Sequence, residues 1–227
     1  MAVPPEAPDL RPDLRRDPRR ERVIGAIAIV LIAVAAAIGL SLLDRQTQAR
    51  IQRNAQEWIR VRLDALVPRA LHDNDLLTDT VIARSPDLLG LESGVTIYRA
   101  RKAGQPVAAV LHTTAPDGYR GPIEMLVAIA ADGRLIGVQV VRHRETPGLG
   151  DAFENRNADW LPKFSGKSLD DPPQQRWAVR PDGGDFDAFT GATITPRAIV
   201  KAIRRALEFY RAKHDQVFSA PNGSEIH

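Results

Sequence analysis

Hydrophobic residues first gather in one long run near the start of the chain. Residues 23–43 carry no charge, and Ser41 is their one hydroxyl. As a helix, this run would extend about 31 Å, which matches the hydrocarbon core of a bilayer, about 30 Å. We therefore predict a transmembrane helix over residues 23–43. A cleaved signal peptide is the alternative, because Ala33-Val34-Ala35 resembles a cleavage site, but the run continues past that point, which favours an uncleaved anchor.

The residues that flank this run predict its orientation. Arginines are more frequent before the run than after it: Arg15, Arg16, Arg19, Arg20 and Arg22, then Arg45, Arg50 and Arg53. By the positive-inside rule, this bias predicts a cytoplasmic N-terminus. Residues 1–22 are rich in Pro, Arg and Asp without apolar periodicity, so we expect a disordered cytoplasmic tail. The chain is thus predicted to be a single-pass protein of a bacterial inner membrane, with its C-terminal domain in the periplasm.

After the anchor, a helical period gives way to the alternation of strands. Apolar residues keep helical spacing from Ile51 to Leu66, so residues 44–93 are expected to form a juxtamembrane helical stalk and its connection. Asp132-Gly133 predicts a hairpin between the last two of four predicted strands, at residues 95–98, 106–114, 123–131 and 135–142. Adjacent strands followed by a helix predict an α+β domain with an antiparallel sheet over residues 94–213, followed by a C-terminal tail at 214–227.

The last long element is an amphipathic helix. Thr195 is a suitable N-cap and Pro196 suits the first helical position. The predicted buried face is Ile199, Ala202, Ile203, Ala206, Leu207 and Tyr210, and the basic face is Arg197, Lys201, Arg204, Arg205 and Arg211. Helix N-termini attract anions. The hydroxyl of Thr193 is therefore expected on a turn beside an anion site, although these local features alone are also typical of an ordinary loop and capped helix.

Composition excludes several kinds of chemistry. The chain has no cysteine, which excludes disulfides, thiolate metal sites and Cys-ligated iron–sulfur clusters. A net charge of +3 over 227 residues does not predict nucleic-acid binding. The histidines have no metal-ligand spacing, and the Asp182–Asp187 cluster lacks the Gly and Glu of an EF-hand. Hydrolase, nucleotide and zinc motifs are missing as well. We predict no metal site and no catalytic residue, so the chain would not be an enzyme by itself.

A threonine-rich string before the last helix carries a family resemblance. Asp187-Ala188-Phe189-Thr190-Gly191-Ala192-Thr193 resembles the flavinylation motif of the FMN-binding domain family. The resemblance implies that Thr193 carries FMN through a phosphoester bond, attached by a flavin transferase that uses FAD. It also implies that Asp187, Thr190, Gly191 and Ala192 are the recognition context.

A second string lies about forty residues earlier. The pattern His-x-Glu-Thr-Pro-Gly-Leu-Gly at residues 143–150 is not a dinucleotide-binding loop, because Phe153 replaces the third glycine. It resembles a signature of the same flavin family, found in the G subunit of the Rnf electron-transport complex and in the C subunit of the sodium-translocating NADH:quinone oxidoreductase. The resemblance implies that the flavin ring contacts Glu145, Thr146, Pro147, Gly148 and Leu149. Tyr119, in Tyr-Arg-Gly-Pro, resembles a further contact element of the family.

Two motifs in the family order favour a membrane-anchored flavoprotein subunit of an Rnf-type complex. By resemblance, such a complex passes electrons between ferredoxin and NAD while ions cross the membrane. The implied partners are the remaining subunits, the membrane and, during maturation, the flavin transferase. The short chain favours the Rnf subunit over the quinone-reductase subunit. Two further hypotheses stay open: a membrane-anchored sensor or assembly module without redox function, and a soluble-type flavin reductase released after signal cleavage.

Overall fold

The computed structural model describes residues 54–91, 94–154 and 159–226, and the isolated positions Leu31, Ala33, Val34, Ala36, Ala37 and Ser41. Those isolated positions are helical and exposed, and the rest of the expected transmembrane span lies outside the described residues. In the part of the chain that is described, no helix is both long and apolar enough to span a membrane. The chain divides into two units, residues 1–55 and 56–227, and the second unit holds the folded domain.

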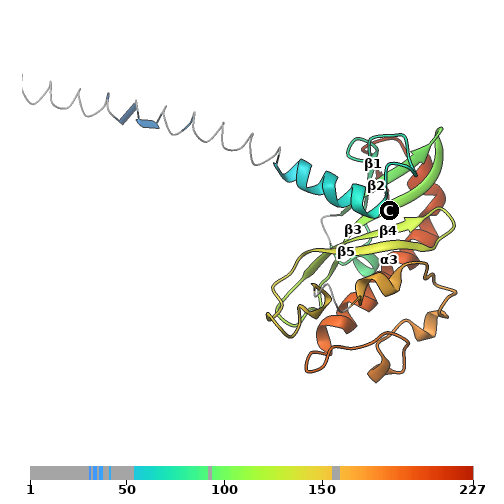
Figure 1. The fold of residues 1–227 in the computed structure, drawn as a ribbon. Helices are drawn as coiled ribbons and strands as arrows, with labels where there is room; N and C mark the ends of the chain where they lie inside the picture. Colours follow the sequence, from blue (N-terminus) through green and yellow to red (C-terminus); the bar gives the residue numbers. More distant parts are fainter. Residues whose placement is uncertain are drawn as a thin grey trace, which may run out of the picture. The chain divides into compact units, whose positions relative to one another are not determined.

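A six-stranded sheet organises this domain (Figure 1). Its spatial order is β5-β4-β3-β2-β1-β6. The strands are β1 (Thr80–Ala83), β2 (Val95–Lys102), β3 (Gln105–Ala115), β4 (Ile123–Ala130), β5 (Leu135–Arg142) and β6 (Glu225–Ile226). The helices are residues 54–66, α2 (Pro86–Leu89) and α3 (Ile194–Ser219), and the 3-10 turns are η1 (Ala152–Glu154), η2 (Leu161–Phe164), η3 (Gln174–Arg176) and η4 (Arg180–Asp182).

The four predicted strands are confirmed as β2 to β5, and β4 and β5 form the hairpin around Asp132-Gly133. The prediction of an antiparallel sheet is wrong in one respect, because β6 pairs with β1 in parallel and the sheet is mixed. Both β1 and β6 lie outside residues 94–213, so the sheet extends beyond the expected domain at both ends.

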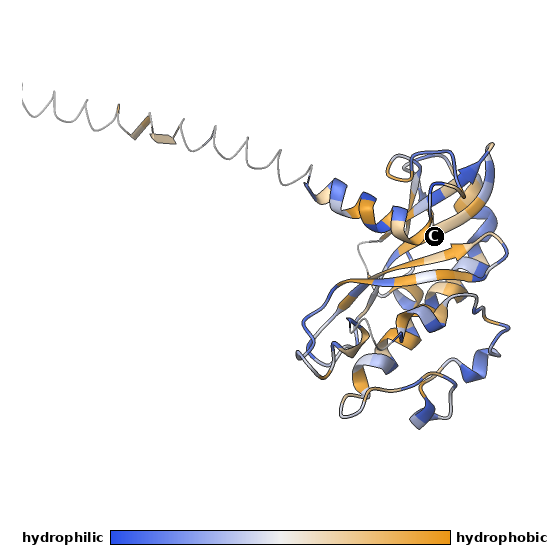
Figure 2. Cartoon of the chain, viewed as in Figure 1, coloured by the Kyte–Doolittle hydropathy of each residue, from blue (hydrophilic) through white to orange (hydrophobic). Residues whose placement is uncertain are grey.

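Each face of the sheet has its own apolar core. On one face, Ile97, Leu111 and Val127 pack with the predicted buried face of α3 and with the aromatic residues between β5 and α3. On the other face, Leu63 and Val67, in and just after the helix of residues 54–66, pack on small strand residues. Figure 2 shows the central strands as one of the most hydrophobic parts of the domain. The sheet is therefore a rigid middle layer, and its ends can support loops.

A buried ion pair ties the end of α3 to the sheet. Arg99 is 2% exposed, and its guanidinium bonds Asp79 at 2.7 Å. The same guanidinium donates to the carbonyls of Val217 and Ala220 at 3.1 and 2.6 Å. Because the last carbonyls of a helix lack intrahelical partners, Arg99 satisfies groups that burial would otherwise penalise. The far end of α3 is thus fixed, which also fixes the position of its N-terminus.

The predicted start of α3 is wrong, because the N-cap residue is Thr193 and not Thr195. The helix begins at Ile194, and Thr193 occupies the N-cap position with φ −79° and ψ −26°. Thr195 lies inside the first turn, where its side chain turns away to a different partner. Pro196 is tolerated there because the first amides of a helix have no intrahelical acceptor. Residues 199, 202, 203, 206, 207 and 210 are all buried, as the periodicity predicts.

Candidate functional site

A cavity of about 190 Å³ brings the two sequence motifs together. It lies at the N-terminus of α3, between the turn that follows β5 and the loop that precedes the helix. Its lining consists of Tyr119, Thr146, Leu149, Gly150, Gly191, Ala192, Thr193, Ile194 and Thr195. Six predicted site residues are in this set: Tyr119, Thr146, Leu149, Gly191, Ala192 and Thr193. The two motifs are about forty residues apart in sequence, so it is the fold that places them side by side at this cavity.

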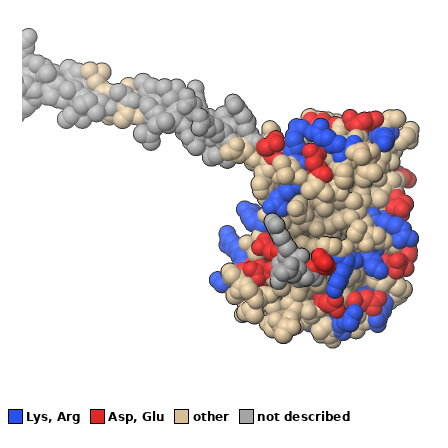
Figure 3. Space-filling view, in the orientation of Figure 1, with Lys and Arg blue, Asp and Glu red and all other residues tan. Residues whose placement is uncertain are grey.

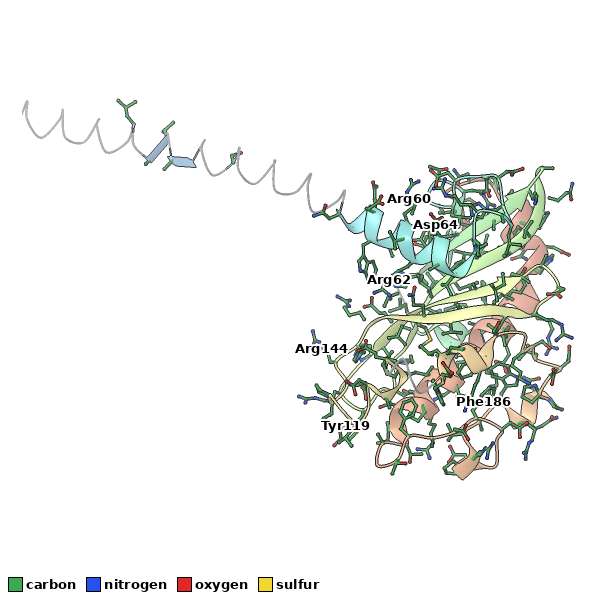
Figure 4. The ribbon with its side chains drawn as sticks, in the orientation of Figure 1. Arg60, Arg62, Asp64, Tyr119, Arg144 and Phe186 are labelled. Atoms are coloured by element: carbon green, nitrogen blue, oxygen red, sulfur yellow. The ribbon has the colours of Figure 1, made fainter. Side chains whose placement is uncertain are left out.

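The rim of the cavity is apolar and open to solvent. Tyr119 is 66% exposed, Leu149 48% and Ile194 44%. Isolated exposed hydrophobics are ordinary, but a group of them around one concave site marks a place where a ligand or partner packs. In Figure 4, Tyr119 and Arg144 lie at the same end of the domain. Figure 3 shows acidic and basic side chains interspersed over the visible face. This face therefore lacks the continuous basic patch that is typical of nucleic-acid binding.

The turn at residues 145–150 forms one wall. Its amides fold back on the turn, since the N–H groups of Leu149 and Gly150 donate to the carbonyl of Thr146 at 3.2 and 3.0 Å. The Gly148 N–H donates to the Asp151 carboxylate at 2.7 Å. These bonds hold Thr146 and Leu149 toward the cavity. Pro147 and Gly148, which the resemblance implies as ring contacts, are both exposed and do not line the cavity.

Glu145 is buried behind this wall rather than in it. Its side chain is 4% exposed, and Oε1 accepts a hydrogen bond from the Arg120 N–H at 3.0 Å. Oε2 accepts a short hydrogen bond from the Thr195 hydroxyl, fifty residues later in the chain. A Cβ at Gly150 would lie 2.8 Å from Oε2, so only glycine leaves room for this arrangement. We call Glu145, Thr195 and the Arg120 N–H the carboxylate clamp.

His143 also holds the turn at residues 145–150 in place, through hydrogen bonds of both of its ring nitrogens. Its Nδ1 accepts the Glu145 N–H at 3.2 Å, and its Nε2 lies 2.9 Å from the Glu154 carboxylate. Because Nδ1 accepts, the ring proton is on Nε2 and bonds Glu154. The ring also makes an edge contact with Phe153, 5.0 Å between centroids. His143 is thus a positioning residue for this turn.

The opposite wall is the loop at residues 187–193. A tight turn brings the Ala192 N–H to the Phe189 carbonyl at 3.1 Å, and Gly191 takes the left-handed φ of +79° that this turn requires. The turn presents Ala192 and Thr193 to the cavity. Thr190 is exposed at its tip and does not line the cavity.

Asp187 faces away from the cavity and anchors the loop. Its carboxylate bonds Lys163 at 2.8 Å and lies 3.1 Å from the Arg180 guanidinium. The hydrogen bond from Lys163, followed by the charges of Lys163 and Arg180, lowers the pKa of Asp187 below its usual value. The Asp187 carbonyl also accepts the indole N–H of the buried Trp160 at 2.9 Å. Asp187 therefore positions the motif without touching the cavity.

Of the residues at the site, Ile194, Gly150 and Thr195 are the ones that the prediction left out. Thr195 shows why: its sequence context, a threonine before a proline, is that of an N-cap, and its actual partner is fifty residues away. The motif contains Gly150, but no local signal shows that its backbone has to pass close to the Glu145 side chain.

Comparisons with known proteins show the family of this chain. The family model described as FMN-binding domain matches residues 118–208, which include all residues that line the cavity. The G subunit of the ion-translocating oxidoreductase complex of Pseudoalteromonas atlantica is 45% identical over 185 residues, covering 82% of this chain and 85% of the relative. The G subunits of the same complex from Shewanella oneidensis and Pseudomonas aeruginosa are 41% and 45% identical, covering 82% and 80% of this chain and 88% and 86% of those relatives.

Residues 118–208 thus form an FMN-binding domain. More particularly, the chain belongs to the family of the G subunits of ion-translocating oxidoreductase complexes, the Rnf type. The resemblance drawn from the two motifs is confirmed, and the C subunit of the quinone reductase is not favoured.

Proposed function

We propose that this chain is a membrane-anchored redox subunit that carries FMN as a phosphoester on Thr193 and relays electrons within an Rnf-type complex. The observation that carries the proposal is the single cavity that joins both motifs and has Thr193 in its lining. Electron transfer would be the chemistry of the flavin, while the protein supplies attachment, orientation and electrostatics.

Three threonines, Thr190, Thr193 and Thr195, lie in the motif loop and the first turn of α3, and Thr193 is the one that suits a covalent bond. Thr190 is exposed but outside the lining, and Thr195 is fully buried with its hydroxyl bonded to Glu145. Thr193 is half-buried in the lining, and its hydroxyl bonds none of the residues that the structure describes. Its oxygen is therefore available to a transferase. In that step Oγ would bond the FMN phosphorus, the pyrophosphate bond of FAD would break, AMP would leave and the hydroxyl proton would be released.

The start of α3 suits the phosphate of such an adduct. The first amide to bond within the helix is that of Arg197, which donates to the Thr193 carbonyl at 3.2 Å. The amides of Ile194 and Thr195 belong to the first turn, where helix amides point out of the helix end. Such amides and the helix dipole favour a phosphate group. A phosphoester on Thr193 would lie directly beside them.

The size of the cavity favours a tethered cofactor. Sites that enclose a whole ligand measure about 300–1,000 Å³, whereas this cavity has about 190 Å³. Leu149, Thr146 and Tyr119 would cover part of the flavin, and the remainder would stay open. An open site gives limited noncovalent affinity but allows electron exchange with a partner, so a covalent bond would keep the cofactor in place.

The N-terminal part of the chain would attach the domain that carries this site to the membrane. We propose that residues 23–43 are the anchor, that residues 1–22 are cytoplasmic, and that the chain after residue 43 leads into the folded domain, in which the helix of residues 54–66 packs on the sheet that includes β1. The domain would then work in the periplasm, where a tether prevents loss of the flavin. The remaining subunits of the complex would be its electron donor and acceptor.

The proposal is tested by producing the full chain together with a flavin transferase. After denaturing gel electrophoresis, the wild-type band is expected to fluoresce under ultraviolet light, and Thr193→Ala is expected to be dark. Thr193→Ser, which keeps a hydroxyl, is expected to fluoresce. A dark wild-type band would contradict the covalent site and would favour a sensor or assembly module.

A further inference from the structure

The carboxylate clamp joins three separate segments behind the cavity. Arg120 belongs to the loop between β3 and β4, Glu145 follows β5, and Thr195 lies in the first turn of α3. Thr195 belongs to the clamp and lines the cavity. Tyr119, next to Arg120, and Thr146, next to Glu145, line the cavity as well. The clamp therefore sets the relative positions of three parts of the lining.

The clamp also places a carboxylate where solvent does not reach. Glu145 is 4% exposed, and both of its oxygens accept hydrogen bonds from groups that do not carry a positive charge, a backbone N–H and a hydroxyl. No ion pair neutralises it among the residues that the structure describes. In its ionised form this side chain would be weakly screened, so its field would act at the adjacent cavity.

We propose that Glu145 is a positioning residue that both holds the cavity together and lowers the reduction potential of the flavin bound there. The inference rests on the proposed function, since it concerns the flavin in that cavity. Reduction adds electrons to the flavin ring, and a fixed negative charge one residue layer behind the wall opposes that addition. Thr195 and the Arg120 N–H keep the carboxylate at this place, while Thr193 stays free for attachment.

Glu145→Gln separates the charge from the hydrogen bonds. The glutamine oxygen can accept the Arg120 N–H, and its amide can donate to the Thr195 oxygen, which reverses the second hydrogen bond and removes the charge. Glu208→Gln is the matched control, because Glu208 is a partly buried carboxylate on α3 that pairs with Arg204 and Gln174, away from the cavity. The full-length proteins are produced with the transferase, purified from membranes in detergent and titrated spectroelectrochemically.

We expect Glu145→Gln to keep its flavin and its equilibrium constant for two-electron reduction to rise about tenfold, a potential shift of about +30 mV. Glu208→Gln is expected to match wild type. An unchanged or lower potential in Glu145→Gln would overturn the proposal. Loss of flavin or of folding in Glu145→Gln would assign Glu145 a purely structural role and would overturn its effect on the potential.

A second pair of variants tests the hydrogen bond itself. Thr195→Val keeps the side-chain shape but removes the donor to Glu145, so we expect severalfold less flavin attached, with Thr195→Ser restoring it. Full attachment in Thr195→Val would contradict the clamp. These results differ from a failure of the proposed function, in which wild type itself would carry no flavin.

Discussion

The two walls of the cavity are held in different ways. The turn at residues 145–150 is held from inside by Glu145 and Thr195, which are 4% and 0% exposed. The loop at residues 187–193 is held at Asp187 mainly from outside, by ion pairs with Lys163 and Arg180 whose side chains are 39–70% exposed, and by one hydrogen bond from the buried Trp160 indole to the Asp187 carbonyl. Buried hydrogen bonds are costly to break, whereas exposed ion pairs contribute little. One wall is therefore rigid, and the other is easier to displace.

This difference suits the two tasks that the proposed function assigns to the walls. The rigid wall would face the flavin ring, whose surroundings need a constant geometry. The more weakly held loop carries Thr193, which an external transferase has to reach. Variants that break each wall in turn can sharpen this comparison.

The largest effect is expected from Glu145→Ala. The substitution leaves the buried Thr195 hydroxyl and the partly buried Arg120 N–H without their acceptor, which costs about 3 kcal/mol in free energy of unfolding. Urea denaturation of the protein without flavin measures it. A cost below about 1 kcal/mol would contradict the rigid wall, since exposed pairs already reach that value.

An intermediate effect is expected from Gly150→Ala. The added methyl would lie 2.8 Å from Glu145 Oε2 and 3.1 Å from Thr195 Oγ1, so we expect a loss of about 2 kcal/mol and less attached flavin. Gly148→Ala is the control in the same turn, because its φ of +77° is strained for alanine but nothing lies within 4 Å. It is expected to cost about 1 kcal/mol without changing the flavin content. Equal flavin contents in the two variants would show that crowding of the clamp is unimportant.

The smallest effect is expected from Asp187→Asn. Its exposed ion pairs contribute less than about 1 kcal/mol at neutral pH. Because Lys163 lowers the pKa of Asp187, this contribution is complete above the unfolded pKa of about 3.9 and is lost as the pH falls through the lower folded value. Wild type and Asp187→Asn should therefore converge in acid.

Thermal unfolding of both proteins at neutral and acidic pH checks this convergence. Asp185→Asn is the control, since Asp185 pairs with Arg176 on the same segment without belonging to the motif. It is expected to leave flavin attachment unchanged, whereas Asp187→Asn reduces it modestly. A difference between wild type and Asp187→Asn that grows in acid would contradict the sign of this effect.

Much of this architecture could be predicted because its signals are local. The alternation in β2 to β5 and the periodicity of α3 are repeated over eight or more residues, and the buried face of α3 follows directly. The strands β1 and β6 have four and two residues, too few for a pattern. Their parallel pairing depends on how the chain returns after α3, which no local signal encodes.

The candidate site shows the same limit. Resemblance identified most residues of the lining, because the motifs are short and continuous. It could not separate the lining from its supports: Asp187 and Glu145 belong to the motifs but lie outside the cavity. Thr195 was assigned to capping because its hydrogen bond to Glu145 joins residues that only the fold brings together.

The most direct test of the account is the location of the flavin. Trypsin is expected to release residues 177–197 as one peptide, because Pro181 protects Arg180. In protein made with a flavin transferase, mass spectrometry should find this peptide heavier by one FMN less one water, and fragmentation should place the adduct on Thr193. An unmodified peptide, or an adduct on Thr190 or Thr195, would contradict the account.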